Sequence, residues 1–422
     1  MAPSPPGSAG SSQSAAPPSP AALSAFWFLH MAGMGMIFPF QSLYLRENVA
    51  LAGTQLGLVL AMRPLIGMFA QPFWGLVADR TGSRGRVLAF ITLGAALSLA
   101  AFPFAESFPA LLFAMAVVAL FGSSVFSMNT SVTLAALGPN AAERFGRIRV
   151  WGTLGFLALV VGFPPLLDSA QARFGLERVP DGPSEPGLES MFWLAGALSA
   201  AAALLAFRTR AAGAASAKAQ PGDLRRLLDH PPFRRALVYA FLAFLFLQGP
   251  ILLLPLFVAD RGGDLATVSR LWIPMLALEI PLVLYSGSVL RRLGPRALLA
   301  IGVLADGGRW LACSFIDDLR FIFALQLLHG VVVAGMIIGL QLYVEKVVPE
   351  RLRSTAQGLL GMVGGSVAGM LSIALGGALI EHVGVDAPYR IGGACAVALG
   401  ACSWLLLPKP VRPDEAGASP AA

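Results

Sequence analysis

Four ionisable side chains interrupt successive apolar stretches in the second half of the chain. They are Glu279, Asp306, Arg309 and His329, each within a few residues of the middle of its stretch. A charge at the centre of a membrane costs about 2.5 kcal/mol or more, so such groups face a cavity and pair with one another. Asp306 and Arg309 lie three residues apart on one helix face and can pair directly. Glu279, His329 and Asp306 are therefore candidate proton-coupling residues, the alternative being a static polar cluster that fixes helix packing.

Other polar and aromatic residues inside apolar stretches are candidate substrate contacts. Arg63 stands just before Pro64, and Gln71 follows eight residues later on the same helix face. Arg63 could contact an anion, or it could donate to backbone carbonyls that the proline leaves free. Asn129 belongs to a polar helix face that lines either a cavity or a helix contact. Trp272 precedes Glu279 by seven residues and could form an aromatic wall beside the acid.

A short basic turn occurs twice. Residues 75–86 read GLVADRTGSRGR and residues 287–296 read GSVLRRLGPR, with Gly75, Arg80, Gly82 and Arg84 repeated at one constant offset. Gly75 and Gly82 permit close backbone approach and a tight turn. Asp79 can form ion pairs with Arg80, Arg84 or a helix N-terminus of the other half. We expect these five residues to form a cytoplasmic gate, the alternative being a basic loop that only sets topology.

Composition indicates a membrane protein. Hydrophobic residues make up 56% of the chain and charged residues only 13%, which is roughly half the charged share of soluble domains. The three cysteines lie in apolar stretches without metal-ligand spacing. We expect no cofactor and no bound metal. Catalytic motifs such as G-x-S-x-G, H-E-x-x-H or a phosphate-binding loop ending in Lys are absent, so the sequence does not indicate an enzyme.

The apolar residues are grouped into segments that can each cross about 30 Å of hydrocarbon. Twelve transmembrane helices are expected, which makes the fold all-α and polytopic. The segments lie near residues 23–45, 53–78, 87–106, 109–137, 146–168, 190–207, 235–259, 266–290, 297–316, 320–346, 355–382 and 387–407.

The repeated turn divides the chain into two similar halves. Residues 23–207 are predicted to form one six-helix bundle and residues 235–407 a second. The connection over residues 208–234 is polar and basic, as expected of a cytoplasmic loop. Residues 1–22 are rich in Ala, Pro and Ser and should be a disordered tail, and residues 408–422 form a second, cytoplasmic tail.

Lysine and arginine are distributed unevenly among the predicted loops. Twenty-one of the 30 fall in the even-numbered loops and the C-terminal tail, and seven in the odd-numbered loops. The positive-inside rule then places both termini and the central loop in the cytoplasm. The excess of basic over acidic residues is thus explained by membrane topology. Nucleic-acid binding is not expected, because no basic patch is interleaved with aromatic residues.

Three stretches resemble a known family. GLVADRTGSRGR is similar to the signature turn between helices two and three of the major facilitator superfamily. FGRIRVWGTLGF at 145–156, QLLHG from 326 and ERLRSTAQGL at 350–359 resemble the lactose permease branch, especially its phenylpropionate transporters. The resemblance implies a monomeric proton symporter in a bacterial-type inner membrane, with protons, a small-molecule substrate and the lipid bilayer as partners.

The resemblance also implies roles for residues. Glu279, Arg309 and His329 match the ionisable network of that branch, and Arg149 matches an arginine that holds sugar. The acidic partner of that arginine has no counterpart in helix four, and the tryptophan that stacks on the sugar is matched by Phe156. These departures argue against lactose-like substrates.

Arg63, Arg149 and Arg309 bring guanidinium groups to or near the cavity. One of them could clamp a carboxylate while Phe156 or Trp272 packs on its body. We therefore expect import of an aromatic or aliphatic carboxylate, with sugars and nucleosides next. Proton-coupled efflux of drugs or metabolites, or a sensor that binds without transport, remain the alternative functions.

Overall fold

The computed structural model describes residues 19–138, 141–177, 185–208 and 222–409, and their side chains except at 141–143, 208 and 283–292. Most of the expected tails, 1–22 and 408–422, and residues 209–221 of the loop 208–234 lie outside these ranges. All regular structure in the described ranges is helical. A helix satisfies its own backbone hydrogen bonds, which a chain this apolar needs inside lipid.

The first half forms one helical bundle. Its helices are α1 (Pro20–Leu43) continued by η1 (Tyr44–Asn48), α2 (Gly53–Thr81), α3 (Arg84–Ala101) continued by η2 (Phe102–Phe104), α4 (Phe108–Gly122) with α5 (Val125–Leu137), α6 (Ala141–Phe174) and α7 (Ser190–Arg208). The connection to the second half contains a short helix, α8 (Asp223–Leu228).

The second half forms the other bundle, with more interruptions. Its helices are α9 (Pro231–Asp260), α10 (Leu265–Cys313), α11 (Leu319–Leu325) with η4 (Gln326–Leu328), α12 (His329–Val332), η5 (Val333–Ile338) and α13 (Gly339–Val347), then η6 (Glu350–Leu352), α14 (Arg353–Leu360), η7 (Gly361–Ala368) and α15 (Gly369–His382), and finally α16 (Ala387–Ala401) and α17 (Ser403–Leu406).

These elements make a twelve-helix membrane protein. Among the described residues, ten helical stretches are long and apolar enough to cross a membrane, and the part of α10 after Gly294 and α16 complete the set. α10 contains two predicted spans, 266–290 and 297–316, because Gly294 (φ 74°) turns the chain before Pro295. α6 extends well beyond the predicted 146–168 at both ends.

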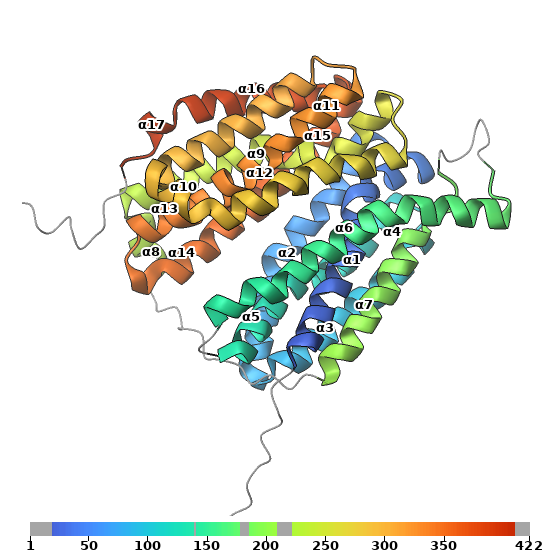
Figure 1. The fold of residues 1–422 in the computed structure, drawn as a ribbon, viewed down its shortest axis with the longest axis horizontal. Coiled ribbons are helices and arrows are strands. Elements are labelled where there is room, and N and C mark those ends of the chain that lie inside the picture. Colours follow the sequence, from blue (N-terminus) through green and yellow to red (C-terminus); the bar gives the residue numbers. More distant parts are fainter. Residues whose placement is uncertain (1–18, 139–140, 178–184, 209–221, 410–422) are drawn as a thin grey trace, which may run out of the picture.

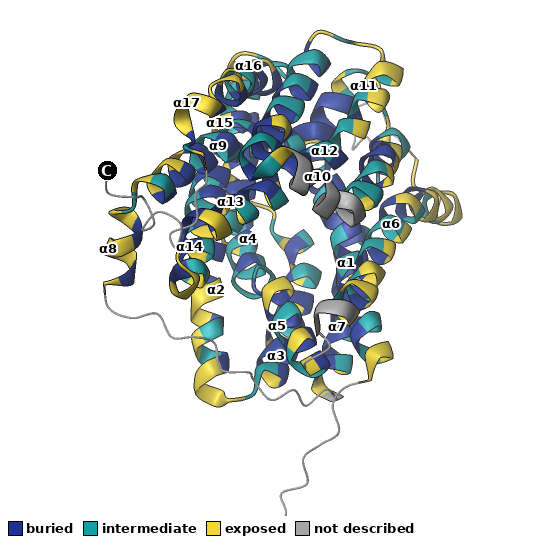
Figure 2. Cartoon of the chain, turned by 60° about the vertical axis from the view of Figure 1, so that its left-hand side comes forward, coloured by how far each residue is buried: buried dark blue, intermediate teal, exposed yellow. Residues whose placement is uncertain are grey.

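The outer surface of the bundles carries many large apolar side chains. Large side chains there are strongly exposed, including Phe69, Leu97, Phe104, Phe113 and Leu405. Figure 2 shows buried residues between the helices and exposed ones along their outer faces. Such a surface is suited to lipid rather than to water.

The two bundles meet at one end, which we call the sealed end. It contains the start of α2 and the end of α15, whose backbones touch: a Cβ atom at Gly57 would lie 2.9 Å from the carbonyl oxygen of Ile373 and 3.0 Å from Cα of Gly377. The Ser269 hydroxyl of α10 also donates to the carbonyl of Val160 in α6, at 2.6 Å. From there the bundles diverge toward the other end, the open end, where α2 stops and α14 begins (Figure 1).

Candidate functional site

The four mid-membrane ionisable groups form one chain of contacts. Arg309 Nη2 donates to Asp306 Oδ1 at 2.5 Å, and Arg309 Nη1 lies 3.3 Å from Nδ1 of His329. His329 Nε2 in turn lies 3.8 Å from Glu279 Oε2. The two halves of α10 and the start of α12 thus bring together residues that are 50 positions apart.

Arg309 is the centre of this chain. Its side chain is 1% exposed, and its Nη1 also donates to Gln326 Oε1 at 3.3 Å. Its guanidinium lies over the Trp310 ring, 4.0 Å from the centroid. A buried cation needs such partners to offset its lost hydration. The guanidinium of Arg309 therefore bonds to groups of the protein itself. The expectation that it contacts substrate finds no support in this geometry.

Side-chain accessibility rises from Arg309 through His329 to Glu279. The Asp306 side chain is 7% exposed, His329 14% and Glu279 27%. Arg309 can only donate hydrogen bonds, so Nδ1 of His329 must accept and the proton of the neutral ring lies on Nε2. That N–H faces Glu279. Glu279 is thus the more accessible of the two acids in this chain of contacts. The group that it faces there is an uncharged ring.

A close helix approach fixes the Glu279–His329 pair. Gly330 follows His329 in α12, and a Cβ atom there would lie 2.6 Å from the backbone nitrogen of Glu279. No larger residue allows the two backbones to approach this closely. The distance between carboxylate and imidazole is therefore set by backbone packing as well as by side-chain rotamers.

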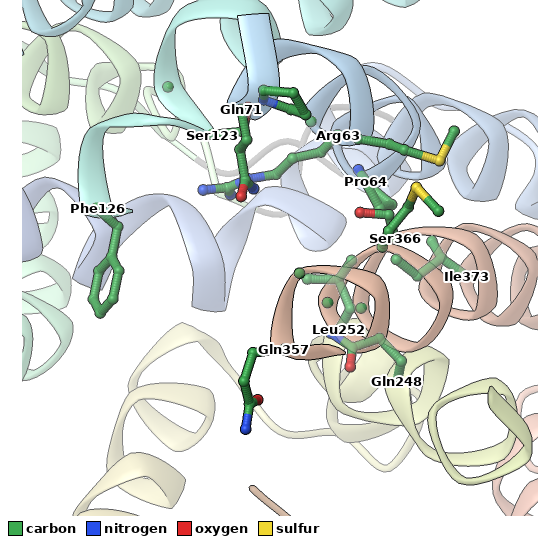
Figure 3. A pocket seen from close by; sticks show the side chains of 18 of the residues that line it. Arg63, Pro64, Gln71, Ser123, Phe126, Gln248, Leu252, Gln357, Ser366 and Ile373 are labelled. Carbon is green, nitrogen blue, oxygen red and sulfur yellow. The ribbon is translucent and has the colours of Figure 1, made fainter. Parts of the chain in front are cut away.

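A cavity of about 1120 Å³ lies between the bundles, toward the open end. It is bounded by α1, α2 and α4 from the first bundle and by α9, α14 and η7 from the second. Figure 3 shows Arg63 and Gln71 on one side and Gln248, Gln357 and Ser366 on the other. None of the described residues that line it is acidic, and five are methionines: Met31, Met34, Met68, Met115 and Met362.

Arg63 is the arginine of this cavity. Its Nη2 lies 3.3 Å from the sulfur of Met34, a weak acceptor. Among the described residues the hydrogen bond of Arg63 goes to this sulfur and none goes to a backbone carbonyl, so an anion contact stays a prediction. Gln71, on the same helix, is also exposed to the cavity.

Arg149 does not line this cavity. Its guanidinium lies 4.8 Å from the Trp27 ring centroid and 5.2 Å from that of Phe126, both cation–π distances. It also interacts electrostatically with Glu279 of the other bundle. Aromatic faces thus take the place of the acidic partner that is missing from helix four, and a substrate contact by Arg149 stays a prediction.

Asn129 is not at the cavity either. The residue is 1% exposed, and within the part of the chain that the structure describes neither its amide nitrogen nor its amide oxygen has a hydrogen-bond partner. Of the two alternatives, a helix contact fits and a cavity contact does not. The polar residues around it belong to α5, which packs on α3 and α6.

Phe156 and Trp272 belong to an aromatic cluster that joins the bundles. The Trp272 ring packs edge-on against Phe156 at 5.2 Å and against Phe38 at 5.6 Å between centroids. Trp272 is 6% exposed and lies one turn from Ser269 in the sealed region. Of these three rings, Phe38 is the one that lines the cavity.

The first copy of the basic turn is folded back on its own bundle. Arg84 donates to Asp79 Oδ1 at 3.0 Å and to the Ser131 hydroxyl of α5 at 2.8 Å. Gly82 has φ 61° and ends α2, as expected of a tight turn. Gly75, in contrast, has open space around it, so the expected close approach is absent here. Asp79 and Arg80 are exposed.

The second copy differs in its contacts. Arg296 donates to the carbonyl of Leu407 at 3.1 Å and lies over the Trp404 ring, so it fastens the end of its own bundle. The side chains of Arg291 and Arg292 lie outside the described residues. Within the described residues, no cluster of three or more His, Cys, Asp or Glu could hold a metal ion.

The sequence matches a family over most of its length. The model of the MFS_1 like family covers residues 21–391. The chain belongs to this family. Its members carry the twelve-helix fold of the major facilitator superfamily, and this chain is a transporter rather than an enzyme.

Individual relatives cover nearly the whole transporter. The maltose permease of Geobacillus stearothermophilus is 29% identical over 392 residues, 92% of this chain and 94% of the permease. The uncharacterized transporter YwbF of Bacillus subtilis (strain 168) is 24% identical over 381 residues, 90% of this chain and 91% of that protein.

Solved structures show the same fold. The crystal structure of the nucleoside transporter NupG superposes with a TM-score of 0.77 at 17% identity, over 92% of this chain and 98% of that one. A D-xylose-proton symporter gives a TM-score of 0.69 at 13% identity, over 93% and 98%.

Several cavity residues of this transporter were not identified from the sequence. Gln248, Gln357 and Ser366 form its polar wall on the second bundle, and His30 lies on the first. The available signal was an amide inside an apolar helix, as at Gln248 before Gly249-Pro250. Gly361 and Gly365 also line the cavity with open space beside them, in the π-helical η7.

Proposed function

We propose that this transporter is a proton symporter that imports a small organic solute by alternating access. The observation that carries the proposal is the chain Glu279–His329–Arg309–Asp306 on neighbouring helices. Charges at this depth are costly and persist where they perform a function such as proton transfer. The loop charges support an open end in the cytoplasm, so the structure would correspond to an inward-open state of a monomer in the inner membrane.

In this proposal Glu279 carries the proton. Asp306 is neutralised by Arg309 and is nearly inaccessible, so it is the weaker candidate. His329 presents a neutral N–H to Glu279 and stabilises the carboxylate once the proton has left. Arg149 interacts electrostatically with Glu279 from the other bundle. Ionisation of Glu279 would therefore favour a state in which the two bundles lie closer together.

A carboxylate is the first candidate substrate. The cavity offers the Arg63 guanidinium, whose partner among the described residues is only a thioether, and no acidic side chain lines it. A carboxylate would give that group a bidentate, charge-assisted partner. The methionine-rich wall is adaptable and makes favourable contacts with aromatic rings, so an aromatic or aliphatic body would fit.

A neutral polyhydroxylated solute is the second candidate. Four glutamines line the cavity, and amides hydrogen-bond sugar and nucleoside hydroxyls: Gln41, Gln71, Gln248 and Gln357. The relative with 29% identity is a maltose permease, and the fold is shared with a nucleoside transporter.

Two experiments test the proposal. Purified protein would be screened by thermal shift against aromatic and aliphatic carboxylates, sugars and nucleosides, and stabilisation by carboxylates alone is the expected result. Proteoliposomes would then be given an inward pH gradient, which should drive accumulation of the hit and should fail with an uncoupler. Expulsion of the solute under that gradient would indicate efflux, and binding without flux would indicate a sensor.

A further inference from the structure

Helix α2 begins with only part of its first turn capped from within: Gln55 Oε1 accepts from the Ala52 N–H at 3.3 Å. Its N-cap is Ala52, which has no side-chain oxygen to accept from the first turn. The first N–H groups of a helix lack intrahelical partners and form the positive end of the helix dipole. Ala at this position therefore leaves α2 with unpaired donors unless another segment supplies an acceptor.

The acceptor comes from the other bundle. The Thr54 backbone N–H, in the first turn of α2, donates to Glu381 Oε2 of α15 at 2.7 Å. A carboxylate is the preferred partner for this end of a helix, because it adds charge to the hydrogen bond. Glu381 thus caps α2 across the boundary between the two halves.

Backbone packing fixes Glu381 over the start of α2. Glu381 follows Gly377 by one helical turn, so both lie on the face of α15 that meets α2. A Cβ atom at Gly53 would lie 3.1 Å from the Glu381 backbone nitrogen and from its Cβ. In this structure the contact accompanies a closed sealed end.

We propose that Glu381 is an outer-gate residue, whose carboxylate caps α2 in the closed form of the sealed end and thereby stabilises the inward-open state. When the bundles part at this end, Glu381 and the Thr54 N–H separate and each returns to water. Only an interaction that differs between the two states shifts their equilibrium, and this cap differs. The proposal goes beyond substrate choice and proton coupling, since neither takes part in it.

The test measures the conformational equilibrium directly. After replacement of the three native cysteines, spin labels would be placed at Glu106→Cys and Val383→Cys, exposed positions near the sealed end on different bundles. Distances would be recorded without substrate and without a pH gradient, so the result is independent of the proposed coupling. Glu381→Ala should lower the ratio of closed to open sealed ends about fivefold, the usual weight of a helix cap.

Glu381→Gln should give a smaller shift, because the amide oxygen still accepts but carries no charge. It also preserves side-chain volume, so it decides the matter if the alanine variant does not fold. Asp264→Asn is the matched control: Asp264 caps α10 by accepting from Thr267 N–H at 2.8 Å, within one bundle. Unchanged distances in both Glu381 variants, or an equal shift in Asp264→Asn, would overturn the proposal.

Discussion

At the scale of single residues, the arrangement separates groups that hold structure from groups that can change charge. Arg309 and Asp306 satisfy one another in a nearly inaccessible position. Glu279 is more accessible and faces a neutral ring. The same reasoning separates Arg63, at the cavity, from Arg149, which rests on two aromatic rings.

Glu279→Gln should abolish uphill accumulation in proteoliposomes. Gln cannot take up or release a proton, but it keeps the side-chain size beside His329 and the helix packing. Counterflow of substrate without a pH gradient should survive in part. Glu345→Gln, at an exposed position near the end of α13, is the control and should still accumulate. Concentrative uptake by the Glu279 variant would move the coupling role to Asp306 or His329.

Arg63→Lys should weaken binding of a carboxylate substrate about tenfold, or ~1.4 kcal/mol, because an ammonium lacks the planar fork. The same change at Arg149 should have a smaller effect on affinity, since its guanidinium contacts Trp27 and Phe126 rather than the cavity. Titration calorimetry measures both. Equal losses of affinity in the two variants would indicate that Arg149 also contacts the substrate. No loss of affinity in Arg63→Lys would favour a neutral substrate.

At the scale of helices, backbone contact decides which side chains meet. The approach of α12 to α10 at Gly330 holds His329 beside Glu279. The approach of α2 to α15 closes one end of the molecule. At the opposite end of α2, Gly82 turns the chain and Arg84 fastens the turn to α5.

Gly330→Ala should impair coupling more than binding. Its Cβ would lie 2.6 Å from the Glu279 nitrogen, so the helices must separate and His329 must move from the carboxylate. Overpacking of this kind costs about 1–3 kcal/mol, measurable as a lower melting temperature. Gly308→Ala, in α10 but with open space around it, is the matched control. Normal pH-driven uptake in Gly330→Ala would show that the pair need not be this close.

Asp79→Asn should shift the resting population toward the inward-open form. We expect Asp79 to exchange its bond to Arg84 for one with the other bundle when the open end closes, and the amide would weaken that bond. The ratio of states should change by about two- to fivefold, the range for an exposed ion pair. Cysteine pairs across the open ends of α2 and α14 report it. Distances equal to those of the wild type would remove Asp79 from the gate.

At the scale of the whole molecule, the two bundles behave as units around a cavity. They touch at the sealed end and diverge from it, with polar walls contributed by both (Figure 3). Alternating access requires the sealed end to part and the open end to close. From the loop charges we expect the open end to face the cytoplasm.

A labelling experiment tests this orientation. In a chain without native cysteines, Gln357→Cys at the cavity should react with a membrane-impermeant maleimide only in inside-out vesicles. Asp317→Cys, whose native side chain is 97% exposed at the sealed end, should react only in right-side-out cells. The opposite pattern would invert the topology and contradict the charge bias.

The sequence by itself determined the class of protein and much of its polar network. Hydrophobic runs predict membrane helices because backbone groups in lipid must bond within their own segment, and that rule is local. For the same reason the Asp306–Arg309 pair, three residues apart on one helix, could be expected without a structure. The repeated turn around Gly82 identified two halves.

Only the tertiary structure decided which polar residues face the cavity. Helix rotation depends on contacts with distant segments, such as Gly330 against Glu279, and no local pattern encodes it. This is why Asn129 proved to be buried away from the cavity while Gln248 and Gln357 line it. The cap of α2 by Glu381 was likewise invisible, because an acceptor 327 residues away replaces the side chain that Ala52 lacks.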